Sequence, residues 1–204
     1  MHTNNSKILY GYKMTHDTEF APNIDYGVLT LATCKPRIRK CAKEGYWISG
    51  WTSNDVQGKQ KKFSFEDEDQ RLIYIAKVSE VMLIKEYWRQ YPDKRPKKLS
   101  DGTYDKGDNI YEPVDREGSR YNQLPNGGGH TENNKERDLS GLNVLICKEY
   151  YYFGVENAVK ITKDYVIHRW KKITDDRAED IICQAKEQYA KLLTYENHIK
   201  QKRL

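Results

Sequence analysis

A polar stretch at residues 92–141 separates two regions of strand-forming sequence, and it constrains the fold more than any other feature. It holds few aliphatic residues and many Gly, Asp, Asn, Lys and Pro residues. A loop of that length without structure of its own is uncommon inside a compact domain, and such loops are usually functional or disordered. We predict that residues 1–204 form a single domain and that 92–141 is a long polar excursion covering it.

The regions flanking the excursion alternate between strand and helix patterns. Aromatic and β-branched runs bounded by turn formers predict strands at 7–12, 26–33, 46–52, 71–79 and 143–153, with one or two more within 158–167. Apolar residues spaced by three and four predict helices at 36–43, 80–91 and 175–200, the last a C-terminal amphipathic helix. Short strands with helices between them indicate an α+β fold: a small, strongly bent mixed sheet or partial barrel with flanking helices.

Several classes of protein are excluded by what the chain lacks. It has no apolar run long enough to span a membrane and no secretory signal at its start, so we expect a cytoplasmic protein with no membrane partner. The four cysteines, Cys34, Cys41, Cys147 and Cys183, form no CxxC pair, which is typical of free thiols that bind no metal. Without a Walker A or GxGxxG loop, we expect no cofactor.

The familiar motifs of hydrolytic enzymes are also absent. The sequence has neither HExxH nor GxSxG. His130-Thr131-Glu132 spells the H-x-E triplet of zinc deaminases, but no PCxxC follows to supply the other zinc ligands. A zinc deaminase is therefore excluded.

Basic residues gather where the second predicted strand meets the first predicted helix. Lys35, Arg37 and Arg39 lie there, and the N–H groups of a helix start favour an anion such as a phosphate. The alternative is that Arg37 and Arg39 pair with acidic side chains. Cys34, at the same junction, is either a nucleophile or the more common buried free thiol. The net charge of +5 and pI near 8.8 leave nucleic acid a possible partner, without the strong basicity of a dedicated duplex binder.

The excursion supplies side chains that read a base or move a proton. Asn109, Tyr111 and His130 are the predicted ligand-binding residues there, since such groups hydrogen-bond base edges and stack on base faces. His130 with Asp108 or Asp138 would form the acid–base pair of an enzyme. Asp108 and Asn109 alternatively form only a turn. We predict one pocket that joins these residues to the basic junction.

Blocks of sequence resemble the nucleotide modification associated domain 2 family. They are FAPN, GVLTLATCKPRIRKCAKEGYWISG, RLIYIAKVSE, EYW, KGDNIY, GGGH, RDLSGLNVLI and YYYFG, in this order between residues 20 and 154. The resemblance implies a role beside DNA or nucleotide base-modification systems of bacteria and phages, without an established reaction. Tyr46 stands where the family tends to carry Asp. The opening pattern is also similar to PUA-like and EVE-type small barrels, which hold a flipped or modified base.

Three functions remain open. The first is a binding protein for a nucleotide or base, including a modified one, because aromatic residues are abundant and catalytic motifs absent. The second is an enzyme that modifies a base or nucleotide, with His130 and Asp108 or Asp138 as acid–base groups. The third is an interaction protein whose C-terminal helix docks a partner, although that helix would more simply pack on its own sheet. Nothing in the sequence indicates the oligomeric state.

Overall fold

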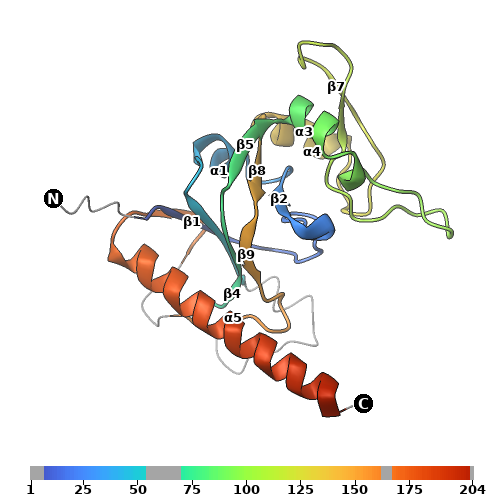
Figure 1. The fold of residues 1–204 in the computed structure, drawn as a ribbon. Coiled ribbons are helices and arrows are strands. Elements are labelled where there is room, and N and C mark those ends of the chain that lie inside the picture. The colour runs from blue at the N-terminus through green and yellow to red at the C-terminus, as the bar shows by residue number, and fades with distance from the viewer. Residues whose placement is uncertain (1–6, 54–69, 162–166, 203–204) are drawn as a thin grey trace. The chain divides into compact units, whose positions relative to one another are not determined.

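The computed structural model describes residues 7–53, 70–161 and 167–202, and the described part is mixed α+β (Figure 1). This confirms the predicted α+β class, but the described strands form three sheets instead of one bent sheet. The similarity to PUA-like and EVE-type barrels stays a prediction. The chain folds into two compact units made of alternating segments. Unit 1 comprises Met1–His16, Tyr46–Ala76 and Tyr150–Leu204, and unit 2 comprises Asp17–Gly45 and Lys77–Glu149. That the whole chain is one domain stays a prediction.

Unit 1 is built on a five-stranded sheet with the strand order β10-β1-β3-β4-β9. The strands are β1 (Leu9–Lys13), β3 (Trp47–Trp51), β4 (Leu72–Lys77), β9 (Glu149–Tyr152) and β10 (Trp170–Ile173). Strand β1 pairs parallel with β3 and antiparallel with β10, so this sheet is mixed. Every residue of β3 is buried, as expected for the middle of a covered sheet.

A long helix, α5 (Asp176–Lys202), packs its apolar stripe on this sheet (Figure 1). Ala178, Ile181, Ile182 and Ala185 are buried in one cluster with sheet residues such as Trp47. This spacing of three and four places all of them on one helix face. In the part of the chain that is described, no helix is long and apolar enough to cross a membrane.

Unit 2 contains a three-stranded antiparallel sheet, a two-stranded ribbon and three α-helices among its described residues. The sheet has the order β2-β8-β5, formed by β2 (Leu29–Leu31), β8 (Asn143–Cys147) and β5 (Glu80–Leu83). The ribbon pairs β6 (Tyr111–Pro113) with β7 (Tyr121–Gln123). The helices are α1 (Pro36–Cys41), α3 (Ile84–Gln90) and α4 (Glu132–Leu139), with 3-10 turns η1 (Asp25–Gly27) and η2 (Pro92–Lys94).

Two predicted elements have different boundaries in the structure. The run 143–153 is two strands in two sheets: β8 is mostly buried, whereas β9, after Lys148, is half-buried. The helix predicted from residue 80 begins at Ile84, because Glu80–Leu83 pair with β8. Residues 162–166 lie outside the described residues, so the strand prediction at 158–167 is described only at its ends, where Val159 bridges Leu72.

The excursion 92–141 belongs to unit 2 and carries η2, β6, β7 and α4. Its aromatic residues reach the unit's core, where Tyr111 and Tyr121 are buried beside Phe20 and Tyr87. The excursion is therefore packed through a few aromatic side chains, which explains how it folds with so few aliphatic residues.

Candidate active site

The turn between β2 and α1 holds Cys34 in an unusual backbone conformation. Cys34 and Lys35 have φ angles of 54° and 41°, in the left-handed region that non-glycine residues rarely adopt. Such a residue costs roughly 1–3 kcal/mol and persists only where its surroundings fix it. Here the Cys34 N–H donates to Asp138 Oδ1 at 3.0 Å, and the Cys34 carbonyl accepts from Arg39 Nε at 2.8 Å. Strain of this kind clusters at functional sites.

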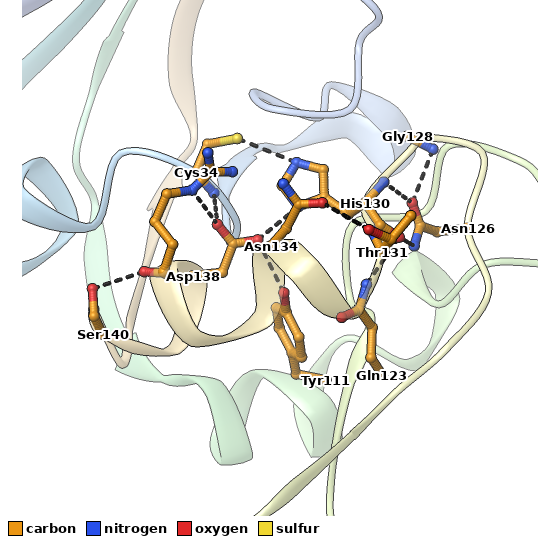
Figure 2. Close-up of polar contacts among 12 residues, drawn as sticks. Cys34, Tyr111, Gln123, Asn126, Gly128, His130, Thr131, Asn134, Asp138 and Ser140 are labelled. Atoms are coloured by element: carbon orange, nitrogen blue, oxygen red, sulfur yellow. Dashed lines mark hydrogen bonds and ion pairs between the residues drawn. The ribbon is translucent and has the colours of Figure 1, made fainter.

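Three side chains of unit 2 form a continuous chain of contacts at this turn. Cys34 Sγ lies 3.3 Å from His130 Nε2, and His130 Nδ1 lies 2.6 Å from Asp138 Oδ2. Figure 2 shows the imidazole between the thiol and the carboxylate. The thiol comes from the strand-to-helix turn, the imidazole from the glycine-rich loop, and the carboxylate from α4. A nucleophile, a base and a group that orients the base are the parts of a catalytic triad.

Asp138 is fully buried and receives four contacts (Figure 2). Besides Cys34 N–H and His130, the Tyr111 hydroxyl donates to its Oδ2 at 2.9 Å. The fourth is the Arg137 guanidinium, whose Nε lies 3.7 Å from Oδ1. These contacts hold the carboxylate in one orientation, which fixes both the ring and the backbone of the thiol residue.

The loop that carries His130 is held by hydrogen bonds to the His130 backbone and by a ring that packs against the imidazole. Asn126 Oδ1 accepts from the His130 N–H at 3.1 Å, while Asn126 Nδ2 and Gln123 Nε2 each donate to the His130 carbonyl at 2.9 Å. The Phe20 ring lies against the imidazole, with centroids 4.9 Å apart. A Cβ on Gly128 would stand 2.1 Å from that phenyl ring, so only glycine fits here.

The charge distribution favours a protonated His130. Burial opposes the charge, but the hydrogen bonds to Asp138 and Cys34 outweigh it and raise the pKa of His130 from 6.5 to about 9. Burial raises the pKa of Asp138, but the hydrogen bond to His130 lowers it, and the net effect is a lowered pKa. An imidazolium donates from both nitrogens, and both facing atoms, a carboxylate oxygen and a sulfur, accept. The charged ring can therefore donate to Asp138 Oδ2 from Nδ1 and to Cys34 Sγ from Nε2.

Arg39 lies behind the site and is fully buried. Its guanidinium donates to the backbone carbonyls of Cys34, Asp138, Gly141 and Asn143. Burial lowers the pKa of Arg39 to about 10, against the opposing charge of Asp138. The guanidinium thus ties α1 to the end of α4 and the start of β8, and four of its five N–H groups are used within the protein.

The other predicted ligand residues lie in different surroundings. Lys35 is half-buried next to Cys34, and burial lowers the pKa of its ammonium group. Arg37 is exposed on α1. Asn109 is buried, and its Nδ2 donates to the carbonyls of Tyr87 and Tyr91 at 3.1 and 3.0 Å. Of the predicted set, side-chain contacts therefore unite His130, Tyr111 and Asp138, and Arg39 joins them through the backbone carbonyls of Cys34 and Asp138.

Asp108 belongs to a separate buried network in unit 2. Its carboxylate accepts from the hydroxyls of Thr30 and Tyr87, each at 2.7 Å, and burial raises its pKa. Lys94 Nζ lies in the same network, donating to Thr30 Oγ1 at 3.1 Å and to Asn23 Oδ1 at 2.7 Å. These bonds fix β2 and the loop before it, so the network supports the strand that leads to Cys34.

The sequence offered Cys34 as either a nucleophile or a buried free thiol, and Cys34 was not included among the predicted site residues. Its signal was the junction itself: a cysteine directly after a strand, two residues before the proline that opens a helix. A strained strand-to-helix turn of this kind exposes a nucleophile in other enzymes. Its partners His130 and Asp138 are 96 and 104 residues further along the chain.

The same three residues are the one group among the described residues whose ligand atoms lie close enough together, within 4.8 Å, for a metal ion. Both Asp138 oxygens already accept hydrogen bonds, from Cys34 N–H, Tyr111 and His130. Asp138 binds the ring at Nδ1, whereas the nitrogen that faces Cys34 is Nε2, so an ion at the thiol would meet Cys34 Sγ and His130 Nε2 first. Two ligands are fewer than the three or four protein ligands of zinc sites. The geometry fits a nucleophile and its base better than a metal centre, and the absence of a bound metal stays a prediction.

Comparison with known families shows a match over nearly the whole chain. The model of the family described as nucleotide modification associated domain 2 matches residues 6–201. No curated protein and no solved structure matches the chain.

Proposed function

The chain belongs to the nucleotide modification associated domain 2 family, and on that premise we propose that it is a thiol-dependent enzyme that modifies a nucleotide or base. The observation that carries the proposal is the chain of contacts from Cys34 through His130 to Asp138, at 3.3 and 2.6 Å. It favours the enzyme over the binding protein, because a pure binding site has no need of an oriented thiol and imidazole. Its setting would be base modification in bacteria or phages.

The proposed reaction begins at a carbon doubly bonded to oxygen or nitrogen. Cys34 Sγ, as the thiolate, forms a bond to that carbon, and His130 Nε2–H gives its proton to the group that leaves. Water or an amine then attacks the thioester or thioimidate, and His130 takes its proton. The C–S bond breaks and the thiolate returns. The balance is hydrolysis or transfer of an acyl or amidine group, without an oxidant or reductant.

Asp138 acts in this scheme as the orienting group and keeps its charge. It accepts from His130 Nδ1, and Tyr111 holds the same oxygen from the other side. Asp108 takes no part, since its carboxylate is bonded to Thr30 and Tyr87 in the buried network. Of the two predicted acid–base pairs, the proposal therefore keeps His130 with Asp138.

Phosphate binding is assigned to the residues that stand beside the thiol. Lys35 follows Cys34 directly and Arg37 is exposed one residue beyond Pro36, which supports a role for both in binding an anion near the reacting carbon. Arg39 serves as a positioning residue, because its guanidinium is engaged with carbonyls of the protein. The substrate would be a nucleotide or a modified base with a phosphate within reach.

A covalent adduct on Cys34 tests the proposal. Full-length protein is incubated with a panel of nucleotides that carry amide, ester or amidine groups, quenched in acid and analysed by peptide mass spectrometry. We expect an adduct on the peptide containing Cys34 and turnover products in solution, both lost in Cys34→Ala and His130→Ala. Nucleotide binding that survives Cys34→Ala, with no adduct and no turnover in the wild type, would contradict the enzyme and leave a binding protein.

A further inference from the structure

The outer strand of the unit 1 sheet carries a run of exposed basic residues. Residues 168–172, HRWKK, are all exposed, and the run contains Arg169, Lys171 and Lys172 but no acidic residue. It includes the first three residues of β10, the last strand on its side of the five-stranded sheet among the described strands. Exposed edge strands commonly carry charge that blocks pairing with another chain. That role does not explain an exposed tryptophan in the same run.

A large aromatic ring stands within the basic run. Trp170 is 44% exposed, and its ring is 6.3 Å from the ring of Tyr10 on the neighbouring strand β1. Tyr10 in turn lies 6.3 Å from Tyr46, which precedes β3. Three rings therefore follow one another across adjacent strands, with the outermost open to solvent. An edge designed only to repel other strands would not expose a tryptophan, whose burial is strongly favourable.

The pairing register places one cation on the same sheet face as the ring. Trp170 pairs with Tyr12 and Lys172 pairs with Tyr10, and residues two apart along a strand share a face about 7 Å from one another. Arg169 and Lys171 alternate to the opposite face, at the free edge. The strand thus offers one stacking surface with cations on both sides of it.

We propose that the edge of β10 binds single-stranded nucleic acid, with Trp170 stacking on a base and Arg169, Lys171 and Lys172 contacting phosphates. Bases of a single strand stack on exposed aromatic rings, and the backbone follows positive charge without regard to sequence. If the proposed function holds, on which this extension rests, such a surface implies that the substrate nucleotide is part of a polymer.

Two other polyanions fit the strand less well. Duplex nucleic acid presents stacked bases, so the ring of Trp170 would gain nothing from it. An anionic membrane would accept the cations, but stable surface binding needs an apolar face, and 168–172 exposes one apolar ring only. Both become comparison arms of the test.

Binding of a fluorescein-labelled oligothymidylate of about 20 nucleotides to the full-length protein, followed by anisotropy, tests the surface. We expect Trp170→Ala to weaken binding about tenfold and Trp170→Phe to recover part of the loss, because a ring remains. Lys172→Glu should weaken binding and flatten its salt dependence, with the slope of log affinity against log salt falling by about 0.7 per lost phosphate contact. Far-ultraviolet circular dichroism verifies that each variant is folded.

The matched controls lie on α5, in the same unit. Lys191→Glu and Tyr195→Ala change an exposed cation and a 66% exposed ring outside the run, and both should bind as the wild type does. Unchanged binding in Trp170→Ala and Lys172→Glu would overturn the proposal, as would equal or tighter binding of a duplex of the same sequence or of phosphatidylserine vesicles. If the oligonucleotide binds but no adduct forms on Cys34, the proposed function is contradicted and this surface is not. If the adduct forms but the oligonucleotide does not bind, this surface is contradicted and the proposed function is not.

Discussion

Asp138 holds both the backbone of Cys34 and the ring that faces its thiol. Its Oδ1 accepts the Cys34 N–H at 3.0 Å, across 104 residues of sequence, while its Oδ2 lies 2.6 Å from His130 Nδ1. One carboxylate therefore couples the strained turn at residue 34 to the orientation of the imidazole. Both the stability of unit 2 and the reactivity of the thiol should depend on it.

Replacing that carboxylate by an amide should damage both properties. Asp138→Asn retains the shape of the side chain but replaces one oxygen by an NH₂ group. In one orientation of the amide this group faces the Cys34 N–H, and in the other it faces Tyr111 and His130. A buried donor without an acceptor costs about 1–3 kcal/mol, and more beside a charge, so we expect the free energy of unfolding to fall by about 3 kcal/mol. Urea denaturation measures it. Asp93→Asn, at an exposed position, is the control and should change stability by less than about 0.5 kcal/mol.

The charge on His130 should make stability depend on pH above neutrality. Its pKa is 6.5 in the unfolded chain and about 9 in the folded protein, so the folded state binds the proton more tightly. The resulting stability is complete below pH 6.5 and disappears as pH rises through 9, a loss on the order of 3 kcal/mol. The lowered pKa of Asp138 acts on the acid side, where stability is lost as pH falls below 3.8.

Urea denaturation between pH 6 and pH 10 measures the alkaline loss. The His130→Gln variant has no titrating ring. Its free energy of unfolding should therefore be lower than that of the wild type at pH 6 and should change less between pH 6 and pH 10. A wild type and a His130→Gln variant that lose stability in parallel over this range would show that the ring is not charged in the folded protein.

Arg39 and Arg37 should respond oppositely to substitution, although they are two residues apart. Lys at position 39 cannot reach the four carbonyls that the guanidinium binds, and the buried carbonyls would lose their donors. We expect Arg39→Lys to cost about 3 kcal/mol or more in the free energy of unfolding. Arg37→Ala, exposed on α1, should leave stability unchanged but weaken nucleotide binding by an amount that shrinks with added salt. A stable Arg39→Lys protein would disprove the positioning role.

A methyl group at position 128 should disturb the imidazole through Phe20. The added Cβ would meet the phenyl ring at 2.1 Å, and that ring lies against His130. Gly128→Ala should therefore lower the reactivity of Cys34 and cost about 1–3 kcal/mol of stability. The double variant Phe20→Leu, Gly128→Ala makes room for the methyl group and should recover part of the stability, as measured by thermal melting. No recovery would show that the clash lies elsewhere.

The positions of several helices and strands could be predicted from the sequence, whereas the hydrogen-bond partners of the buried polar residues could not. The spacing of three and four between apolar residues predicts the buried face of α5, formed by Ala178, Ile181 and Ile182. Helix α4 gave no such signal: Asp138 is its one buried residue, and its start is fixed by a capping box between Thr131 and Asn134. A helix without an apolar face has no periodicity to detect.

Arg39 shows why the site was only partly predictable. In the sequence it reads as one cation among several at a helix start, and that pattern indicates an anion site. The carbonyls that bind it come from residues 34, 138, 141 and 143, most of them about 100 residues away. His130, Tyr111 and Asp138 were predicted by residue type, but the thiol they surround becomes evident only from the three-dimensional contacts.

The alkylation rate of Cys34 tests the central claim most directly. The protein carries its own references, since Cys41 and Cys183 are exposed and Cys147 is buried, with its pKa raised by that burial. Limiting iodoacetamide at pH 6.5, followed by peptide mass spectrometry, compares all four thiols in one sample. We predict that Cys34 reacts at least about tenfold faster than Cys41 and Cys183, although it is less exposed, and that His130→Ala removes the difference. A Cys34 that reacts no faster than these two, or equally fast without His130, would contradict the account.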